Sequence, residues 1–198
     1  MNALTPSPQE APTRLSYSAV LGLSRESDAE WAKLRGMQYA APSEVTFLRV
    51  YAHTILAVFI AQVYLAFVPT LLLGIWIVAL TLLQIAGARF DRTLADVDRR
   101  KITRSEFYRQ SMTSGVSGLL WGGCVLVFGP MGTQHGLMAL VLVITIISSG
   151  AIYFRTSPPL GAVLYAAISG LCVVTYLGLS GLWFATAVYI GFSITTIL

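Results

Sequence analysis

The two histidines of this chain have the side chains with the broadest chemistry. A histidine inside a helix can ligate a haem or respond to pH, and His53 follows Arg49 by about one helical turn in the first apolar segment. His135 begins the fourth apolar segment, so the two imidazoles are expected near opposite ends of a helical bundle and could not ligate one haem together. The alternative for His53 is a hydrogen bond to a neighbouring helix or a headgroup. We therefore expect no cofactor.

Other polar or reactive side chains also lie within apolar segments. Gln62 and Gln84 are amides that would be costly in hydrocarbon unless paired. With His53 and Trp121, Gln62 is a candidate for ligand binding or sensing. Cys124 and Cys172 read as small buried hydrophobic residues, since two isolated thiols predict neither a disulfide framework nor a metal cluster. No metal site is expected.

Motifs for catalysis are missing from the sequence. It contains no nucleotide-binding glycine loop, zinc signature or nucleophile elbow. No acidic residue falls inside an expected membrane span, which disfavours a proton-coupled transporter. Asp91, Asp96 and Asp98 alternate with arginines, a pattern typical of ion pairs on a solvated helix. No catalytic residue is assigned, and a lipid-modifying membrane enzyme is the least favoured class.

Small residues gather on the third apolar segment. Gly115, Gly118 and Gly122 include a small-xxx-small step, which lets two helix backbones approach closely. The close approach could form a dimer interface, the wall of a ligand cavity, or packing within one bundle. Packing within the bundle is favoured.

Composition and segment length predict the fold class. The chain of 198 residues is 56% hydrophobic and 11% charged, whereas soluble domains carry about 25% charged residues. Since a membrane helix needs about 20 mainly apolar residues, we expect an all-α, polytopic membrane bundle with six transmembrane helices. The expected spans are 47–67, 70–88, 110–128, 136–154, 158–177 and 182–198.

Three regions are expected along the chain. Residues 1–26 are rich in proline and small polar residues, which predicts a disordered tail. Residues 27–41 predict a short amphipathic helix with a capping box at Ser27 and Glu30, lying in the headgroup layer or packed on the protein. Residues 43–198 form the transmembrane domain. Its last span has 17 residues and no polar flank, so we expect the sixth helix to be truncated and to continue into the cytoplasm.

The cations predict the orientation. All 13 Lys and Arg residues can lie on one side of the membrane, and positively charged loops stay in the cytoplasm. Both chain ends are therefore expected there. The net charge of +4 is explained by this flanking pattern and predicts no nucleic-acid partner. The residues expected to set topology and contact lipid headgroups are Arg49, Arg89, Arg92, Arg99, Arg100, Lys101, Arg104, Arg109 and Arg155.

Several segments resemble a known class of membrane domain. They are AEWAKLRGMQY (29–39), FYRQSMTSGVSGLLWG (107–122), SGLLWGGCVLVFGP (117–130) and ISSGAIYFRTSPPLGAVLYAAISG (147–170). The pattern is similar to the six-helix N-terminal input region of bacterial GGDEF/EAL cyclic-di-GMP proteins and of some membrane histidine kinases. The resemblance covers roughly residues 28–198. No GGDEF, EAL or phosphoacceptor motif is present, so it transfers no catalytic residue.

The resemblance implies a function and a location. The chain would be a sensory or anchoring input domain in the bacterial inner membrane, forming a homodimer and coupled to a cytoplasmic output domain in the same polypeptide. The parent protein would be a diguanylate cyclase, a phosphodiesterase or a histidine kinase. The alternative is a small transporter or channel with three-plus-three helical repeats, although no clear internal repeat is visible.

Overall fold

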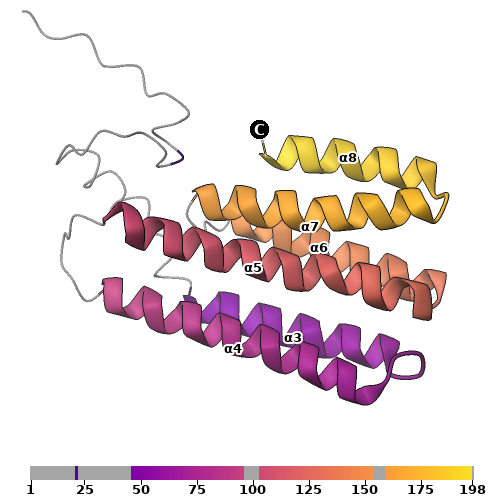
Figure 1. Ribbon diagram of the computed structural model, residues 1–198, viewed down its shortest axis with the longest axis horizontal. Helices are drawn as coiled ribbons and strands as arrows, with labels where there is room; N and C mark the ends of the chain where they lie inside the picture. The colour runs from indigo at the N-terminus through magenta and orange to yellow at the C-terminus, as the bar shows by residue number, and fades with distance from the viewer. Residues whose placement is uncertain (1–20, 22–45, 96–102, 154–158, 198) are drawn as a thin grey trace, which may run out of the picture.

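The protein is all-helical in the part that the structure describes. The computed structural model describes Leu21 and residues 46–95, 103–153 and 159–197. These ranges hold six α-helices, one 3-10 turn and no strand, which confirms the expected helical class (Figure 1). The elements are α3 (Thr46–Tyr64), α4 (Thr70–Ala95), α5 (Arg104–Phe128), η1 (Gly129–Met131), α6 (Gln134–Tyr153), α7 (Pro159–Leu179) and α8 (Trp183–Ile197). Apart from Leu21, the expected N-terminal tail lies outside the described residues, and so does the expected amphipathic helix.

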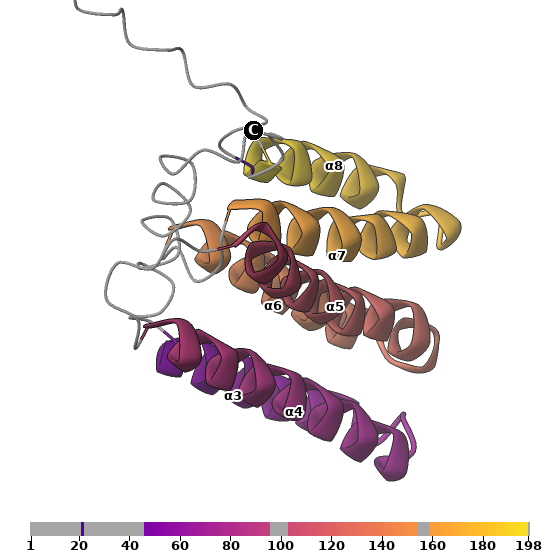
Figure 2. The same ribbon diagram turned by 60° about the vertical axis from the view of Figure 1, so that its left-hand side comes forward.

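The helices run alternately up and down in three layers. The α3–α4 hairpin forms one layer, α5, α6 and α7 form the middle, and α8 lies on the far side against α7 (Figures 1 and 2). The most extensive helix contact joins α5 to α7, which are not consecutive in the chain. The core lies where α3 and α4 meet the middle layer.

The start of α5 agrees with the sequence pattern in detail. Thr103 and Glu106 form the predicted capping box. The Glu106 backbone N–H donates to the Thr103 hydroxyl at 3.3 Å, and the Thr103 N–H donates to the Glu106 carboxylate at 2.9 Å. The helix then continues into the third apolar segment and ends at Phe128, before Pro130.

The α7–α8 turn also follows from its residues. Gly181 has φ of 72°, a left-handed conformation that suits glycine, and no Cβ would meet another atom there. The Leu182 N–H donates to the Leu177 carbonyl at 3.0 Å, which satisfies a carbonyl at the end of α7. The chain therefore reverses sharply, and α8 runs back along the bundle.

Five of the helices, α3 to α7, are long and apolar enough to cross a membrane. Large apolar side chains also remain exposed, including Leu71 (77%), Leu119 (55%) and Leu142 (58%). These features are those of a multi-pass membrane protein, in which such faces meet hydrocarbon. The sixth apolar segment forms α8, whose 15 residues span about 22 Å, less than a hydrocarbon core of about 30 Å.

Charged residues of the described ranges lie at one end of the bundle, here called the basic end. It comprises the start of α3 with Arg49, the end of α4 with Arg89, Asp91 and Arg92, and the first turns of α5. The turns at 65–69, 129–133 and 180–182 form the opposite end and carry no charged side chain. The charge asymmetry of the sequence is therefore present in three dimensions.

Candidate functional site

A buried ion pair joins α3 to α4 near the basic end. The Arg49 guanidinium donates to the Asp91 carboxylate, and their side chains are only 8% and 1% exposed. Thr46 donates to the same carboxylate at 3.1 Å, and the Gln110 amide donates to it from α5 at 2.8 Å. Three helices are thus tied to one carboxylate. A buried charge is tolerated only with such pairing.

This arrangement corrects two expectations. Arg49 was expected to meet lipid headgroups, but it is buried against Asp91. Asp91 was expected on a solvated helix after the second span, yet α4 runs past the expected end at Ala88 to Ala95 and Asp91 is buried at the basic end. An acidic residue is therefore enclosed within the bundle. Its partner lies 42 residues away, so local spacing did not reveal the pair.

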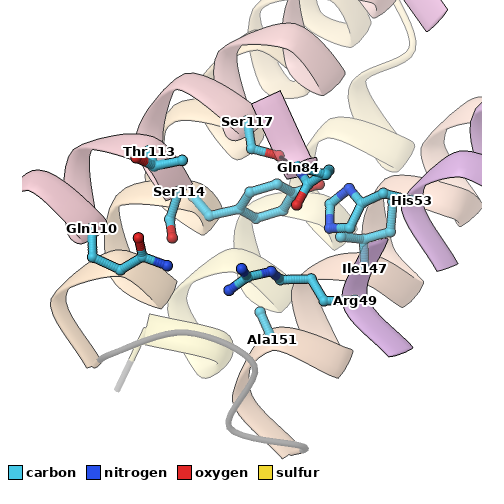
Figure 3. Close-up of a pocket in the computed structure, with 10 residues that line it drawn as sticks. Arg49, His53, Gln84, Gln110, Thr113, Ser114, Ser117, Ile147 and Ala151 are labelled. Carbon is cyan, nitrogen blue, oxygen red and sulfur yellow. Dashed lines mark hydrogen bonds between the residues drawn. The ribbon is translucent and has the colours of Figure 1, made fainter. Parts of the chain in front are cut away.

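A small polar cavity adjoins the ion pair (Figure 3). It has a volume of about 20 Å³, and five helices, α3 to α7, contribute to its wall. A cavity needs about 10–15 Å³ by this measure to hold one water molecule, so the space is water-sized. It lies in the basic half of the bundle. The lining residues are Arg49, His53, Gln84, Gln110, Thr113, Ser114, Ser117, Ile147, Ala151 and Tyr165.

Side chains from neighbouring helices are hydrogen-bonded around this cavity. The Gln84 amide donates to the Ser117 hydroxyl at 2.9 Å, which satisfies an amide on α4 with a group on α5. Gln84 is 5% exposed and Ser117 is 4% exposed, so this bond is shielded from lipid. Gln84 therefore has the hydrogen-bond partner that the sequence analysis expected an intramembrane amide to need.

His53 and Trp121 are brought together by the fold. The Trp121 indole N–H donates to His53 Nδ1 at 2.9 Å, linking α3 to α5 across the buried core. Because Nδ1 accepts this bond, the imidazole proton must sit on Nε2 and the ring is neutral in this arrangement. Hydrogen bonding to a neighbouring helix was one of the two expectations for His53, and the geometry matches it.

Aromatic rings continue from this pair through the core. Each ring contacts the next, with centroid separations from 5.2 to 6.3 Å and mostly tilted or edge-on geometry. Such geometry suits the quadrupoles of aromatic rings. The row connects the cavity to the uncharged end of the bundle. In order, its members are Tyr165, His53, Trp121, Trp76, Phe128 and Tyr64.

Replacing His53 by leucine should destabilise the bundle by about 1–3 kcal/mol, because the buried Trp121 N–H loses its acceptor. The double variant His53→Leu/Trp121→Phe should lose less than the sum of the two single variants, since neither polar group then remains. Unfolding by SDS titration in mixed micelles measures these free energies. Additive losses would show that the two side chains are not coupled.

Gly115, Gly118 and Gly122 of the third segment face α7 of the same chain. A Cβ on Gly118 would lie 2.7 Å from the Tyr165 carbonyl oxygen, and one on Gly122 would lie 2.8 Å from the Ser169 Cα. Gly115 lies against the Ile168 and Leu164 side chains more loosely. The close α5–α7 contact therefore requires the absence of side chains at two of these positions.

The remaining candidates lie elsewhere. Gln62 is exposed on the outer surface of α3 and does not reach the cavity, and His135 is exposed at the start of α6. Cys124 is buried and Cys172 is partly buried, and both are free thiols. Groups of three or more residues able to hold a metal ion are not found among the described residues.

The basic residues outside the ion pair are mostly exposed. Arg92 lies over the Phe47 ring at 4.8 Å, and Arg109 lies over the Phe90 ring at 4.9 Å, contacts typical of cation–π pairs. Arg89 is also exposed. The Arg104 side chain and the residues Arg99, Arg100, Lys101 and Arg155 lie outside the part that the structure describes.

The sequence analysis did not assign Asp91, Gln110 or Tyr165 to a functional site. One signal could have found the first: α4 has no glycine or proline between Ala88 and Ala95, so the helix had no reason to stop before Asp91. Comparison of the chain with protein-family models, curated proteins and solved structures finds no match. The geometry and chemistry of the site must therefore support any functional conclusion.

Proposed function

We propose that this chain is the sensory input domain of a bacterial signalling protein, with a cytoplasmic output domain in the same polypeptide and a homodimeric assembly. The observation that carries the proposal is the polar cavity, which five helices line and whose wall includes Tyr165 of α7. Helix α7 in turn carries α8. A change in the cavity can thus shift α7, and with it α8, between two packings.

Further support comes from the contrast between the helices. Helices α3, α4 and α5 are fixed to one another by the Arg49–Asp91 network, whereas α8 packs mainly on α7. Helices α3 to α5 thus form a fixed part beside the polar cavity, and α8 is a peripheral helix. This arrangement suits the transmission of a signal to α8 better than membrane anchoring alone. The resemblance of roughly residues 28–198 to membrane input regions favours the same role.

The proposed orientation places the basic end in the cytoplasm of the bacterial inner membrane. Positively charged ends of membrane helices stay on that side. Helix α8 runs from the uncharged end back to the basic end (Figure 1). It is therefore the helix that would lead to a cytoplasmic output domain.

Labelling of introduced cysteines should report this orientation. Ser180 and Ser105 are exposed at opposite ends of the bundle. A membrane-impermeant maleimide should label Ser180→Cys in intact spheroplasts, but Ser105→Cys only after permeabilisation. The unsubstituted chain is the control, since Cys124 and Cys172 lie within helices that cross the membrane. The reverse pattern would overturn the proposed orientation.

The sensory role is tested by fusing the whole chain, through Leu198, to a reporter enzyme whose output depends on helix association. Tyr165→Phe removes only the hydroxyl at the cavity and should change the reporter output several-fold at equal membrane level. Leu171→Ala, on the lipid-facing side of α7, is the matched control and should leave the output unchanged. Equal output from the wild type and both variants would contradict sensing through this cavity.

One observation favours the runner-up, a small transporter or channel. Polar side chains from four helices, α3, α4, α5 and α7, converge within the membrane-crossing part of the bundle, as at a transporter substrate site. The residues 1–198 reconstituted in liposomes would then catalyse flux of a small solute. Flux abolished by Tyr165→Phe but retained by Leu171→Ala would support transport in place of sensing.

A further inference from the structure

Polar atoms on two uncharged residues that line the cavity have no hydrogen-bond partner within the described part of the chain. They are the Tyr165 hydroxyl on α7 and the Gln110 amide oxygen on α5. Tyr165 is 3% exposed and Gln110 is 1% exposed, so bulk water does not reach either side chain freely. Buried polar groups in folded proteins nearly always have a partner from the protein or from ordered water.

The Gln110 orientation is set by its other bond. Its amide nitrogen donates to Asp91 at 2.8 Å, so the amide oxygen is the atom left without a hydrogen-bond partner from the described protein. In Figure 3 the Gln110 amide lies beside the Arg49 guanidinium and Ser114, at the edge of the cavity. The atom without a protein partner is therefore an acceptor, and its ligand must carry an N–H or O–H donor.

The size and charge of the cavity restrict which molecules can bind there. A cavity of about 20 Å³ accommodates a molecule the size of water and not a metabolite. The Arg49 charge is compensated by Asp91, so the wall of the cavity has no net charge to attract an ion. The ligand is a neutral, water-sized hydrogen-bond donor, and small gases without such a donor do not fit.

We propose that the cavity is a hydration site, in which ordered water hydrogen-bonds the Tyr165 hydroxyl and the Gln110 amide oxygen. Water at this place joins α7 to the Arg49–Asp91–Gln110 network. The contact between α5 and α7 then depends on water within the membrane-crossing part of the bundle. The idea that this water regulates the output through α8 rests on the proposed sensory function. The presence of the water does not.

The test is water-edited solid-state NMR on the full chain in lipid bilayers, in which magnetisation passes from water protons to nearby carbons and nitrogens. The Tyr165 ring carbon that bears the hydroxyl and the Gln110 side-chain nitrogen should gain signal several-fold faster than the Leu140 methyl groups. Leu140 is the reference because it is fully buried in the apolar core and does not line the cavity.

Filling the cavity supplies a second measurement. Ala151 lines it from α6 and is 8% exposed, so Ala151→Leu should place methyl groups in the space and slow transfer to Tyr165 toward the Leu140 rate. Transfer to Tyr165 and Gln110 in the wild type as slow as that to Leu140 would overturn the hydration site, whether or not the variant folds. Fast transfer in the wild type, together with a reporter output that Ala151→Leu leaves unchanged, would support the hydration site and contradict the sensory function.

Discussion

Replacing Asp91 by leucine is expected to destabilise the bundle by about 3–5 kcal/mol, because it leaves the Arg49 guanidinium buried without its compensating charge. The loss includes the acceptor of the Gln110 amide and of Thr46, which both donate to the same carboxylate. Helices α3 and α5 thus lose their common partner on α4 at once. SDS titration in mixed micelles, followed by circular dichroism, measures the change in unfolding free energy.

A double variant separates the charge from the packing. Arg49→Met/Asp91→Leu removes both charges and keeps most of the side-chain volume, so it should be more stable than Asp91→Leu alone. Arg92→Met is the matched control, since Arg92 is exposed and should contribute less than about 1 kcal/mol. If the double variant were as unstable as the single one, the buried charge would not be the cause of the loss.

Gly118→Ala is expected to destabilise the bundle by about 1–3 kcal/mol, because the added methyl group would meet α7 backbone. A Cβ there would lie 2.7 Å from the Tyr165 carbonyl oxygen and 3.0 Å from the Tyr165 Cα. Backbone atoms cannot rotate away as a side chain can, so α5 and α7 must separate. Tyr165 and the cavity would move with them. The same unfolding titration measures the effect.

Gly123 provides the control on the same helix. A Cβ at Gly123 would meet no atom within 4 Å, so Gly123→Ala should be neutral or should stabilise α5 by up to about 1 kcal/mol through helix propensity. A loss for Gly118→Ala no larger than that for Gly123→Ala would show that the close α5–α7 contact does not exist in the membrane.

Local patterns predicted the helices and several of their ends. The capping box at Thr103, the stop before Pro130 and the turn at Gly181 depend on residues within a few positions of one another. Hydrophobic length predicted six membrane spans, of which five form helices long and apolar enough to cross a membrane. The end of the second span was misplaced, because polarity after Ala88 was taken as exposure to water although Asp91 is paired inside the bundle.

The candidate site could be predicted only in part. His53 and Trp121 were chosen as individual residues, and the fold joins them by a hydrogen bond across 68 positions of sequence. Of the two intramembrane amides, Gln62 was chosen as a candidate and Gln84 was not, yet only Gln84 faces the core. Gln62 and Gln84 differ because they lie on different sides of their helices, and only the side with Gln84 meets neighbouring helices. In apolar helices with little contrast between faces, that side is not visible in the sequence.

The sequence by itself determined that the protein is an apolar, helical chain with its charges gathered at one end. These properties arise from composition and from spacing along single helices, which hold wherever the helices pack. Only the tertiary structure decided that Arg49 pairs with Asp91, that Gly118 and Gly122 face α7, and that Gln110 and Tyr165 border one cavity. The physical reason is that these contacts depend on how helices rotate and pair, and many side chains distant in sequence settle that choice together.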